Sequence, residues 1–297
     1  MTLSISVVMP SYNQAKYIEK SILSVLSQDV PNLEFVIYDN LSDDGTLEIL
    51  KKYESQLRWI SEKDNGQAHA VNKGIQNTTG DIIGWLNSDD LYYPGAIKTI
   101  RDFFETHPDV DLVYGDADHI DMEDKWIEDY YTEPWDHERL KDVCYLCQPA
   151  TFFRRKVTED FGLIDERLNY CMDYEYWLRL GGRGIKVAYL PVKLAGSRLY
   201  PDNKTLGSKI KVHAEINDMF IRLSGSVPDK WIFNYAHIFL DEKDVARTRR
   251  VLFPLLVSIL SLWAALKWNR RVSKVMLSTT TLWIRGAVHN MVRRIES

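Results

Sequence analysis

Acidic and amide side chains that could bind a charged ligand recur at three places in the N-terminal part of the chain, each just after an apolar run. They are Asp39 with Asn40, Asp64 with Asn65, and the tetrad Asn87-Ser88-Asp89-Asp90. Clustered carboxylates can hold a hard divalent cation, and Mg²⁺ or Mn²⁺ commonly uses one or two of them together with substrate phosphates. Asp, Asn and Ser also populate turns and helix N-caps, so any single place has a simpler explanation. Recurrence at three successive run ends favours a binding site.

Motifs of several other site chemistries are absent from the sequence. No G-x-G-x-x-G follows the first apolar run and there is no G-x-x-x-x-G-K-[ST], which argues against a dinucleotide-binding turn and a P-loop. The chain also lacks H-E-x-x-H and G-x-S-x-G. Cys144-x-x-Cys147, beside Cys171 and His137, has an alternative interpretation as a zinc site, but a single C-x-x-C favours buried, reduced thiols.

The elements that must position these side chains alternate between strands and helices. Apolar runs at 5–9 and 35–38 are typical of buried parallel strands, and apolar residues at helical spacing over 18–26 predict a crossover helix between them. Ligands bind outside the carboxyl ends of such strands, which is where the acids fall. Further strands are predicted at 58–60, 81–86, 112–114, 150–153 and 185–190, and helices at 46–53, 66–76, 94–106, 174–180 and 204–223. Gly181 and Gly182 are expected to cap the helix over 174–180.

Five segments together resemble, in order, the motifs of family-two glycosyltransferases with a GT-A fold. They are SVVMPSYN (6–13), YDNLSDDGT (38–46), NKG (72–74), TGDIIGWLNSDD (79–90) and MDYEYWLR (172–179). The resemblance covers about residues 4 to 205. It implies an α/β fold of GT-A type, with a mostly parallel sheet flanked by helices, a Rossmann-like nucleotide-binding half and an acceptor half. It also implies an inverting, metal-dependent glycosyltransferase of the bacterial cell-surface polysaccharide type.

The resemblance also implies a set of donor-binding residues. Asp39 matches the family acid that hydrogen-bonds the nucleotide base, a role that suits a carboxylate accepting from the imide N–H of uracil. Tyr12 and Asp64 match positions of the donor pocket, with a rim aromatic and a turn residue as the simpler explanations. Asn87 stands at the first position of the family D-x-D, where an amide can bond a ribose hydroxyl but is a weak metal ligand; Ser88 follows it.

Two carboxylates match the reacting centre of the family. Asp89 matches the D-x-D residue that holds a metal, Mn²⁺ or Mg²⁺, at the donor pyrophosphate. Asp173 matches the catalytic base that takes the proton of the acceptor hydroxyl. Met172 replaces the Glu that often precedes this base. From its position alone, Asp173 is equally suited to be the N-cap of the following helix.

Two further segments, 148–155 and 196–205, resemble stretches that border the family's active site. In the second, Tyr200 stands where many relatives have His, which puts a metal or phosphate role at that position in doubt. Arg198 and Lys204 are candidates to face the diphosphate, with solvated loop charges as the alternative.

Charge and hydropathy set the C-terminal part of the chain apart. The net charge of −5 is a sum of about +9 from residue 245 onward and about −14 before it. We therefore expect a catalytic domain over 1–225 and a basic, apolar helical tail over 226–297. The apolar stretch 251–266 would span about 24 Å as a helix, short of the roughly 30 Å hydrocarbon core. Its basic flanks favour an anchor at a membrane surface; a helical pair that docks or dimerises is the alternative.

The sequence thus predicts a glycosyltransferase that moves a sugar from a nucleotide-sugar donor, a UDP-sugar, to a hydroxyl of a glycan or lipid-linked glycan, with inversion. Three cysteines and no N-terminal signal pattern predict a cytoplasmic protein, peripheral at the inner face of the membrane; a homodimer is an open alternative. No motif supports nucleic-acid binding. The rival enzyme is a sugar-nucleotide-forming nucleotidyltransferase, but its Gly-rich loop is absent after Pro10. A non-catalytic glycan-binding scaffold is the other rival, and retention of Asp89 and Asp173 argues against it.

Overall fold

The computed structural model describes residues 2–28, 30–201, 203–204 and 206–295. It divides into two compact units, Met1–Pro201 and Asp202–Ser297. The division falls before helix α8 (Lys209–Ser224), whereas the sequence suggested a boundary at Gly225. The reason is that α8 packs on α9 (Asp229–Asp241), with the Phe220 and Trp231 ring centroids 6.4 Å apart.

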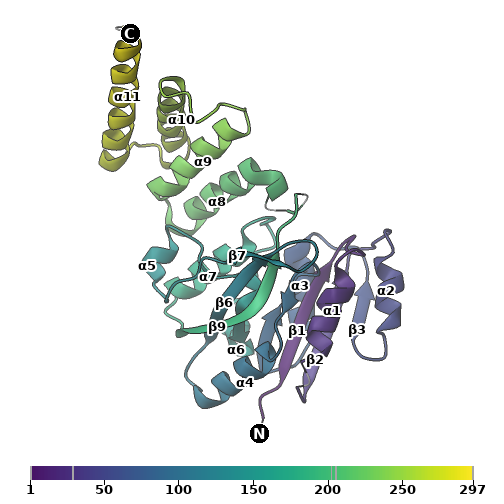
Figure 1. The fold of residues 1–297 in the computed structure, drawn as a ribbon. Helices are drawn as coiled ribbons and strands as arrows, with labels where there is room; N and C mark the ends of the chain where they lie inside the picture. The colour runs from purple at the N-terminus through teal and green to yellow at the C-terminus, as the bar shows by residue number, and fades with distance from the viewer. Residues whose placement is uncertain (1, 29, 202, 205, 296–297) are drawn as a thin grey trace. The chain divides into compact units, whose positions relative to one another are not determined.

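The described part of the first unit contains a nine-stranded sheet with two differently built halves (Figure 1). The parallel half has the order β3-β2-β1-β4, and the other half continues as β8-β6-β9-β5, with β7 paired to β6. The strands of the first half are β1 (Ile5–Ser11), β2 (Leu33–Asp39), β3 (Arg58–Ser61) and β4 (Ile82–Trp85). Those of the second are β5 (Leu91–Tyr92), β6 (Leu112–Ile120), β7 (Trp126–Asp129), β8 (Thr151–Arg154) and β9 (Val187–Arg198).

Helices flank this sheet, as the resemblance predicted (Figure 1). They are α1 (Ile18–Leu26), α2 (Thr46–Lys52), α3 (Gln67–Gln76), α4 (Ala96–Thr106), α5 (His137–Leu140), α6 (Arg155–Phe161) and α7 (Met172–Gly182). Helix α3 approaches β1 so closely that a Cβ on Gly74 would lie 2.1 Å from Val8 Cγ1. The glycine of the NKG motif therefore sets the distance between helix and sheet.

Strand direction brings the ends of several strands to one edge. Strands β1 to β4 run parallel, and β8 pairs antiparallel with both β4 and β6, so β6 runs in the same direction as β4. Strand β9 is parallel to β6, with Arg198 opposite Ile120. The residues after β1, β2, β3, β4 and β9 consequently meet at the same edge of the sheet.

Strands β6 and β9 are longer than the sequence predicted, and the β6–β7 hairpin was not predicted. The cause is that acids within β6 interrupt the run of apolar residues from which a strand is predicted. Asp118 is buried, accepts a hydrogen bond from Tyr93 Oη at 2.8 Å and forms an ion pair with Lys193 of β9. A charge paired across the sheet cannot be recognised as a strand-interior residue from the local sequence.

The second unit is helical in its described part. Helices α8, α9, α10 (Leu252–Asn269) and α11 (Lys274–Ile295) pack in succession along the chain. The apolar helix expected over 251–266 and a helix after it are both present. Among the described residues, α10 is the one helix long and apolar enough to cross a membrane by length and composition.

The two glycines expected to cap α7 lie instead within its last turn, and Gly184 beyond it takes the left-handed conformation. A Cβ on Gly181 would lie 2.4 Å from His137 Nδ1 and 2.9 Å from Trp135 Cζ2. The same atom on Gly182 would lie 3.8 Å from its nearest neighbour. Gly181 is therefore required for the contact between α5 and α7, and Gly182 is not.

This difference gives a test of the packing around α7. Gly181→Ala should destabilise the protein by about 1–3 kcal/mol, because ring atoms must move to admit the methyl group. Gly182→Ala should be neutral or stabilising by up to about 1 kcal/mol, because alanine is the better helix former. Urea unfolding followed by circular dichroism measures both. Equal midpoints for the two variants would contradict this packing.

Candidate active site

Three predicted donor-binding residues lie together at the strand-end edge. Ser11 is opposite Asp39 in the β1–β2 register, so Tyr12 follows β1 at the edge where β2 ends at Asp39. Asp64 N donates to Asn40 Oδ1 at 2.9 Å, which ties the loop after β3 to the loop after β2. Burial raises the pKa of the Asp64 carboxyl, and the charge of Asp39 adds to this effect. The Tyr12 side chain is 59% exposed, so its ring is open to a ligand.

Asp39 is a buried carboxylate fixed by neighbouring serines. It accepts from Ser42 N at 2.9 Å, from Ser42 Oγ, and from Ser61 Oγ at 2.7 Å. A carboxylate offers about four acceptor positions, so these bonds use three of them. One position remains to accept a hydrogen bond from a ligand.

Asn87 holds the end of β4 in place. Its Oδ1 accepts from Gln67 Nε2 at 2.7 Å and from Trp85 Nε1 at 3.0 Å, and its Nδ2 donates to Asp90 Oδ2 at 3.2 Å and Gln148 Oε1 at 2.9 Å. All the hydrogen-bonding positions of the amide are used within the protein. The contact with Gln148 brings the segment after 148, expected to border the site, against the tetrad.

Asp89 is held by two residues that follow the predicted last strand. Tyr200 Oη donates to Asp89 Oδ2 at 2.8 Å, and Arg198 Nε donates to Asp89 O at 2.7 Å. Arg198 N donates to Asp90 Oδ1 at 2.9 Å. Burial raises the pKa of the Asp89 carboxyl; burial and the adjacent Asp89 charge raise that of Asp90. Tyr200 therefore restrains one oxygen of the predicted metal ligand.

Arg198 is buried rather than a solvated loop charge. Its Nη1 donates to Asp121 O at 2.8 Å and forms an ion pair with Asp124 in the β6–β7 turn. Its guanidinium lies 4.9 Å from the centre of the Tyr17 ring, which packs on Tyr200 at the same centroid distance of 4.9 Å. In this structure Arg198 supports the loop that carries Asp89. Within the predicted segment 196–205, Asp202 and Thr205 lie outside the described residues, and Lys204 is exposed.

The residues of the tetrad differ in their fitness to hold a metal. Asn87 uses its amide oxygen twice, both oxygens of Asp90 accept hydrogen bonds, and Ser88 is buried with its carbonyl accepting from Ser21 Oγ at 3.0 Å. Among the described residues no group of three or more His, Cys, Asp or Glu could hold a metal ion. Within the tetrad, Asp89 is therefore the residue best suited to offer a carboxylate oxygen to a metal. That fits Mg²⁺ or Mn²⁺ completed by substrate phosphates and water.

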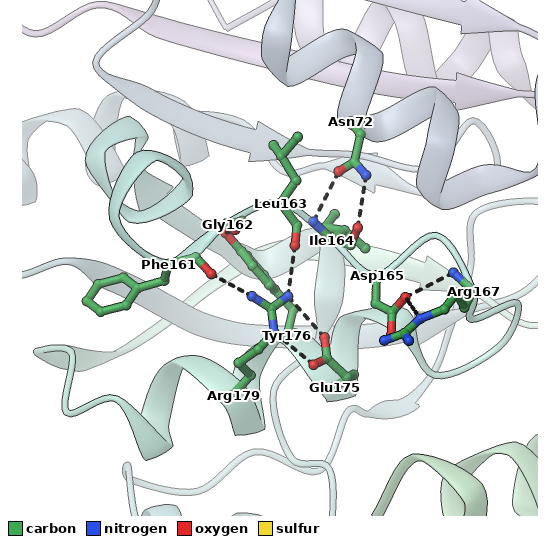
Figure 2. Close-up of polar contacts among 10 residues, drawn as sticks. All are labelled: Asn72, Phe161, Gly162, Leu163, Ile164, Asp165, Arg167, Glu175, Tyr176 and Arg179. Carbon is green, nitrogen blue, oxygen red and sulfur yellow. Dashed lines mark hydrogen bonds and ion pairs between the residues drawn. The ribbon is translucent and has the colours of Figure 1, made fainter. Parts of the chain in front are cut away.

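A network of buried polar contacts fixes the loop before α7 (Figure 2). Asn72 on α3 pairs with the backbone of Ile164 in both directions, at 2.9 Å and 3.1 Å. Arg179 on α7 donates to Phe161 O and Leu163 O, each at 2.8 Å, and forms an ion pair with Glu175. The NKG and MDYEYWLR motifs therefore join the parallel half of the unit to the helix that carries Asp173.

Asp173 lies in the first turn of α7 and is partly buried. The N-cap is Cys171, so the alternative interpretation of Asp173 as the N-cap is wrong, although its Oδ1 accepts from Tyr174 N at 2.8 Å. Burial raises the pKa of the Tyr130 phenol, and the charges of Asp173 and Asp90 raise it further.

Comparison with known proteins identifies the family of the chain. The family model described as Glycosyl transferase family 2 matches residues 6–162. Chondroitin synthase of Escherichia coli is 32% identical over 186 residues, covering 61% of this chain and 27% of that protein. The chain spans less than two thirds of the length of each of the first curated relatives that it matches.

Solved glycosyltransferase structures share the fold at low sequence identity. Staphylococcus aureus TarS 1-349 in complex with UDP-GlcNAc has a TM-score of 0.61 and 15% identity, covering 98% of this chain and 92% of that one. The mannosyltransferase PcManGT of Pyrobaculum calidifontis, in complex with GDP-Man and Mn²⁺, has a TM-score of 0.57 and 18% identity, covering 100% and 87%. The GT-A-type fold predicted from the motifs is confirmed.

The chain belongs to glycosyl transferase family 2. Its strand-end edge carries the predicted donor residues, and its helix α7 carries Asp173. The residues that sequence reasoning missed are mainly supporting ones: Gln67, Asn72 and Arg179, which fix loops by side-chain bonds. Asn72 belongs to the NKG motif and Arg179 to the MDYEYWLR motif. This membership was the sequence signal that could have identified them.

The tetrad gives a second test. Asn87→Asp, which would create the common D-x-D, should destabilise the protein by about 1–3 kcal/mol near neutral pH, because two amide donors are lost facing Asp90 and Gln148. The loss should shrink as the pH falls, since a protonated carboxyl regains an O–H donor. Urea unfolding at neutral and acidic pH measures this.

The matched control is Asn65→Asp, which places the same new charge on an exposed residue at the neighbouring strand end. Its effect should stay within about 0.5 kcal/mol. An Asn87→Asp variant as stable as this control would show that the amide bonds of Asn87 do not hold the end of β4.

Proposed function

We propose that this glycosyltransferase transfers a sugar from a UDP-sugar to a hydroxyl of a glycan or lipid-linked glycan, with inversion, in cell-surface polysaccharide biosynthesis. The observation that carries the proposal is that Asp39, Asp64 and Asp89 all follow strands at one edge of the sheet. Asp173, in the first turn of α7, is the acid assigned to the acceptor. The bound UDP-GlcNAc and GDP-Man of the structural neighbours support a nucleotide-sugar donor.

The donor base is recognised by Asp39 and Tyr12. The remaining acceptor position of Asp39 suits the imide N–H of uracil, which a carboxylate can bind. The exposed Tyr12 ring offers a face for the base to stack on. Guanine also presents a ring N–H to a carboxylate, so the preference for uracil is the part of this proposal that needs direct measurement.

Asp89 is the residue that would hold Mn²⁺ or Mg²⁺ together with the donor diphosphate. The Tyr200 hydrogen bond fixes one carboxylate oxygen and so orients the group toward the site. When bound, the cation neutralises the negative charge on the leaving nucleoside diphosphate. Asn87 and Ser88 serve the donor by shaping the loop after β4, because their own polar groups bond within the protein.

Asp173 acts as the general base. A hydroxyl is a poor nucleophile until a positioned carboxylate accepts its proton. The oxygen then attacks the anomeric carbon from the face opposite the leaving group; the C–O bond to the diphosphate breaks, and the configuration inverts. The anchoring of α7 through Arg179 and Asn72 keeps Asp173 in place during this step.

The helical second unit supports a lipid-linked acceptor. Its charge and apolar surface favour a peripheral position at the inner face of the cell membrane, with homodimerisation as the alternative use of the same helices. Enzyme and acceptor would then meet on one surface.

A thermal-shift panel tests the donor. UDP-sugars with Mn²⁺ should stabilise the protein by about 2.7 kcal/mol when the free donor is 100 times its Kd, and GDP-sugars should stabilise it less. Asp39→Ala should abolish this difference between bases. Equal stabilisation by both donor classes would contradict the assignment of uracil; stabilisation by none would favour a scaffold without turnover.

Substitution of the two acids tests the mechanism. Asp173→Asn should lower kcat about 10²- to 10⁴-fold while leaving donor-induced thermal stabilisation unchanged, because the base acts on the acceptor. Asp89→Asn should abolish the effect of Mn²⁺ on donor binding.

Asp160→Asn is the control, because Asp160 is an exposed acid on α6; its turnover should equal that of the wild type. Wild-type turnover by Asp173→Asn would overturn the assignment of the base.

A further inference from the structure

Helix α10 leaves an apolar side uncovered. Its residues Leu252, Ile259, Trp263 and Leu266 are 42%, 62%, 49% and 55% exposed. They recur seven, four and three residues apart, which places them along one line of the helix. We call them the apolar stripe. Apart from Lys267, they are the residues of α10 that the structure leaves exposed.

The opposite side of α10 is packed within the second unit. Its buried residues include Phe253, Val257, Ala264 and Trp268, and α10 contacts α9 and α11. A helix that is apolar all round is found in a protein core or in a membrane. Here the protein covers one side of α10, and the described residues leave the other side exposed.

Positive charge borders the apolar stripe at both ends. Arg249 and Arg250 precede α10, and Arg270, Arg271 and Lys274 follow it; all five are exposed. The Lys267 ammonium lies 4.0 Å from the centre of the Trp268 ring and 5.5 Å from that of Trp263. Between Asp244 and Glu296 the sequence contains no acid.

We propose that α10 lies in the plane of an anionic lipid surface, with the apolar stripe inserted among the acyl chains and the flanking basic residues bound to lipid phosphates. The inference deepens the proposed function, on which it rests for the peripheral location. Long cationic side chains can reach the headgroups from both helix ends while the stripe stays in hydrocarbon. Each basic residue near an anionic membrane adds to the attraction.

The same observations argue against a transmembrane helix. The 18 residues of α10 span about 27 Å, less than the roughly 30 Å hydrocarbon core. Crossing would also carry α9 and α11 into hydrocarbon, because they pack on α10, and α11 has exposed polar residues such as Arg285 and His289. Basic residues lie at both ends, whereas an oriented span carries them mainly at its cytoplasmic end.

A second copy of the chain is a poorer cover for the stripe. Two α10 helices packed stripe to stripe, parallel or antiparallel, would bring a basic end of one against a basic end of the other. The acid-free sequence from Val245 to Ile295 offers no carboxylate to offset that repulsion. An anionic lipid surface complements the stripe and both ends at once.

Vesicle binding by the full chain tests the proposal. We expect the wild type to bind phosphatidylcholine vesicles with about 30 mol% phosphatidylglycerol at least about tenfold more tightly than phosphatidylcholine alone. Ile259→Asp should weaken binding about tenfold or more, because the inserted side chain becomes charged. Arg270→Gln with Arg271→Gln should weaken binding to anionic vesicles and leave binding to neutral ones unchanged.

Leu223→Asp is the matched control, since Leu223 is a partly exposed leucine of α8 in the same unit but outside the stripe. It should bind vesicles like the wild type. Equal circular dichroism and Tm for the three variants and the wild type would show that they are folded.

Three outcomes would overturn the proposal. They are equal binding by Ile259→Asp and wild type, resistance of the membrane-bound protein to alkaline carbonate, which indicates a span, and a lipid-free dimer that Ile259→Asp dissociates, which indicates a second copy. Sugar transfer to a water-soluble acceptor separates this test from the proposed function. Ile259→Asp should retain that transfer, and Asp173→Asn should lose it while still binding vesicles.

Discussion

The pairing of the Asn72 side chain with the backbone of Ile164 is the interaction on which the candidate site depends most. One buried amide satisfies both the N–H and the C=O of a loop residue far away in the sequence. Arg179 then ties α7 to the same loop. Leaving such buried groups without partners would cost about 1–3 kcal/mol each, so the loop has one favourable position. The position of Asp173 on α7 is therefore set by contacts that begin at Asn72 on α3.

The candidate site also shows how polar side chains are divided between support and ligand binding. Asn87 and Arg198 hold the loop that carries Asp89, and their hydrogen bonds are made within the protein. The Tyr12 ring is exposed, and Asp39, although buried, uses three of the about four acceptor positions of a carboxylate within the protein. Residues of a recognised motif thus fall into two groups, and only hydrogen-bond geometry separates them.

In the second unit, the burial of apolar side chains again explains how the helices pack. Its helices bury one side of α10 and leave the apolar stripe outside, between two basic ends. Apolar surface of this kind is favourable only when something removes it from water. An anionic lipid surface would do so.

The sequence by itself determined the parallel half of the fold, because short apolar runs followed by acids are a local pattern, and ordered motifs determined the family. It also placed Tyr12, Asp39 and Asp64 at one edge, since parallel strands must end together. Only the tertiary structure decided the extent of β6 and β9, where Asp118 is paired by Lys193 across the sheet. It alone decided that Arg198 is buried and that Gly181, not Gly182, is required by a neighbour. These features depend on contacts between residues distant in sequence, so they cannot be predicted from the periodicity of the local sequence.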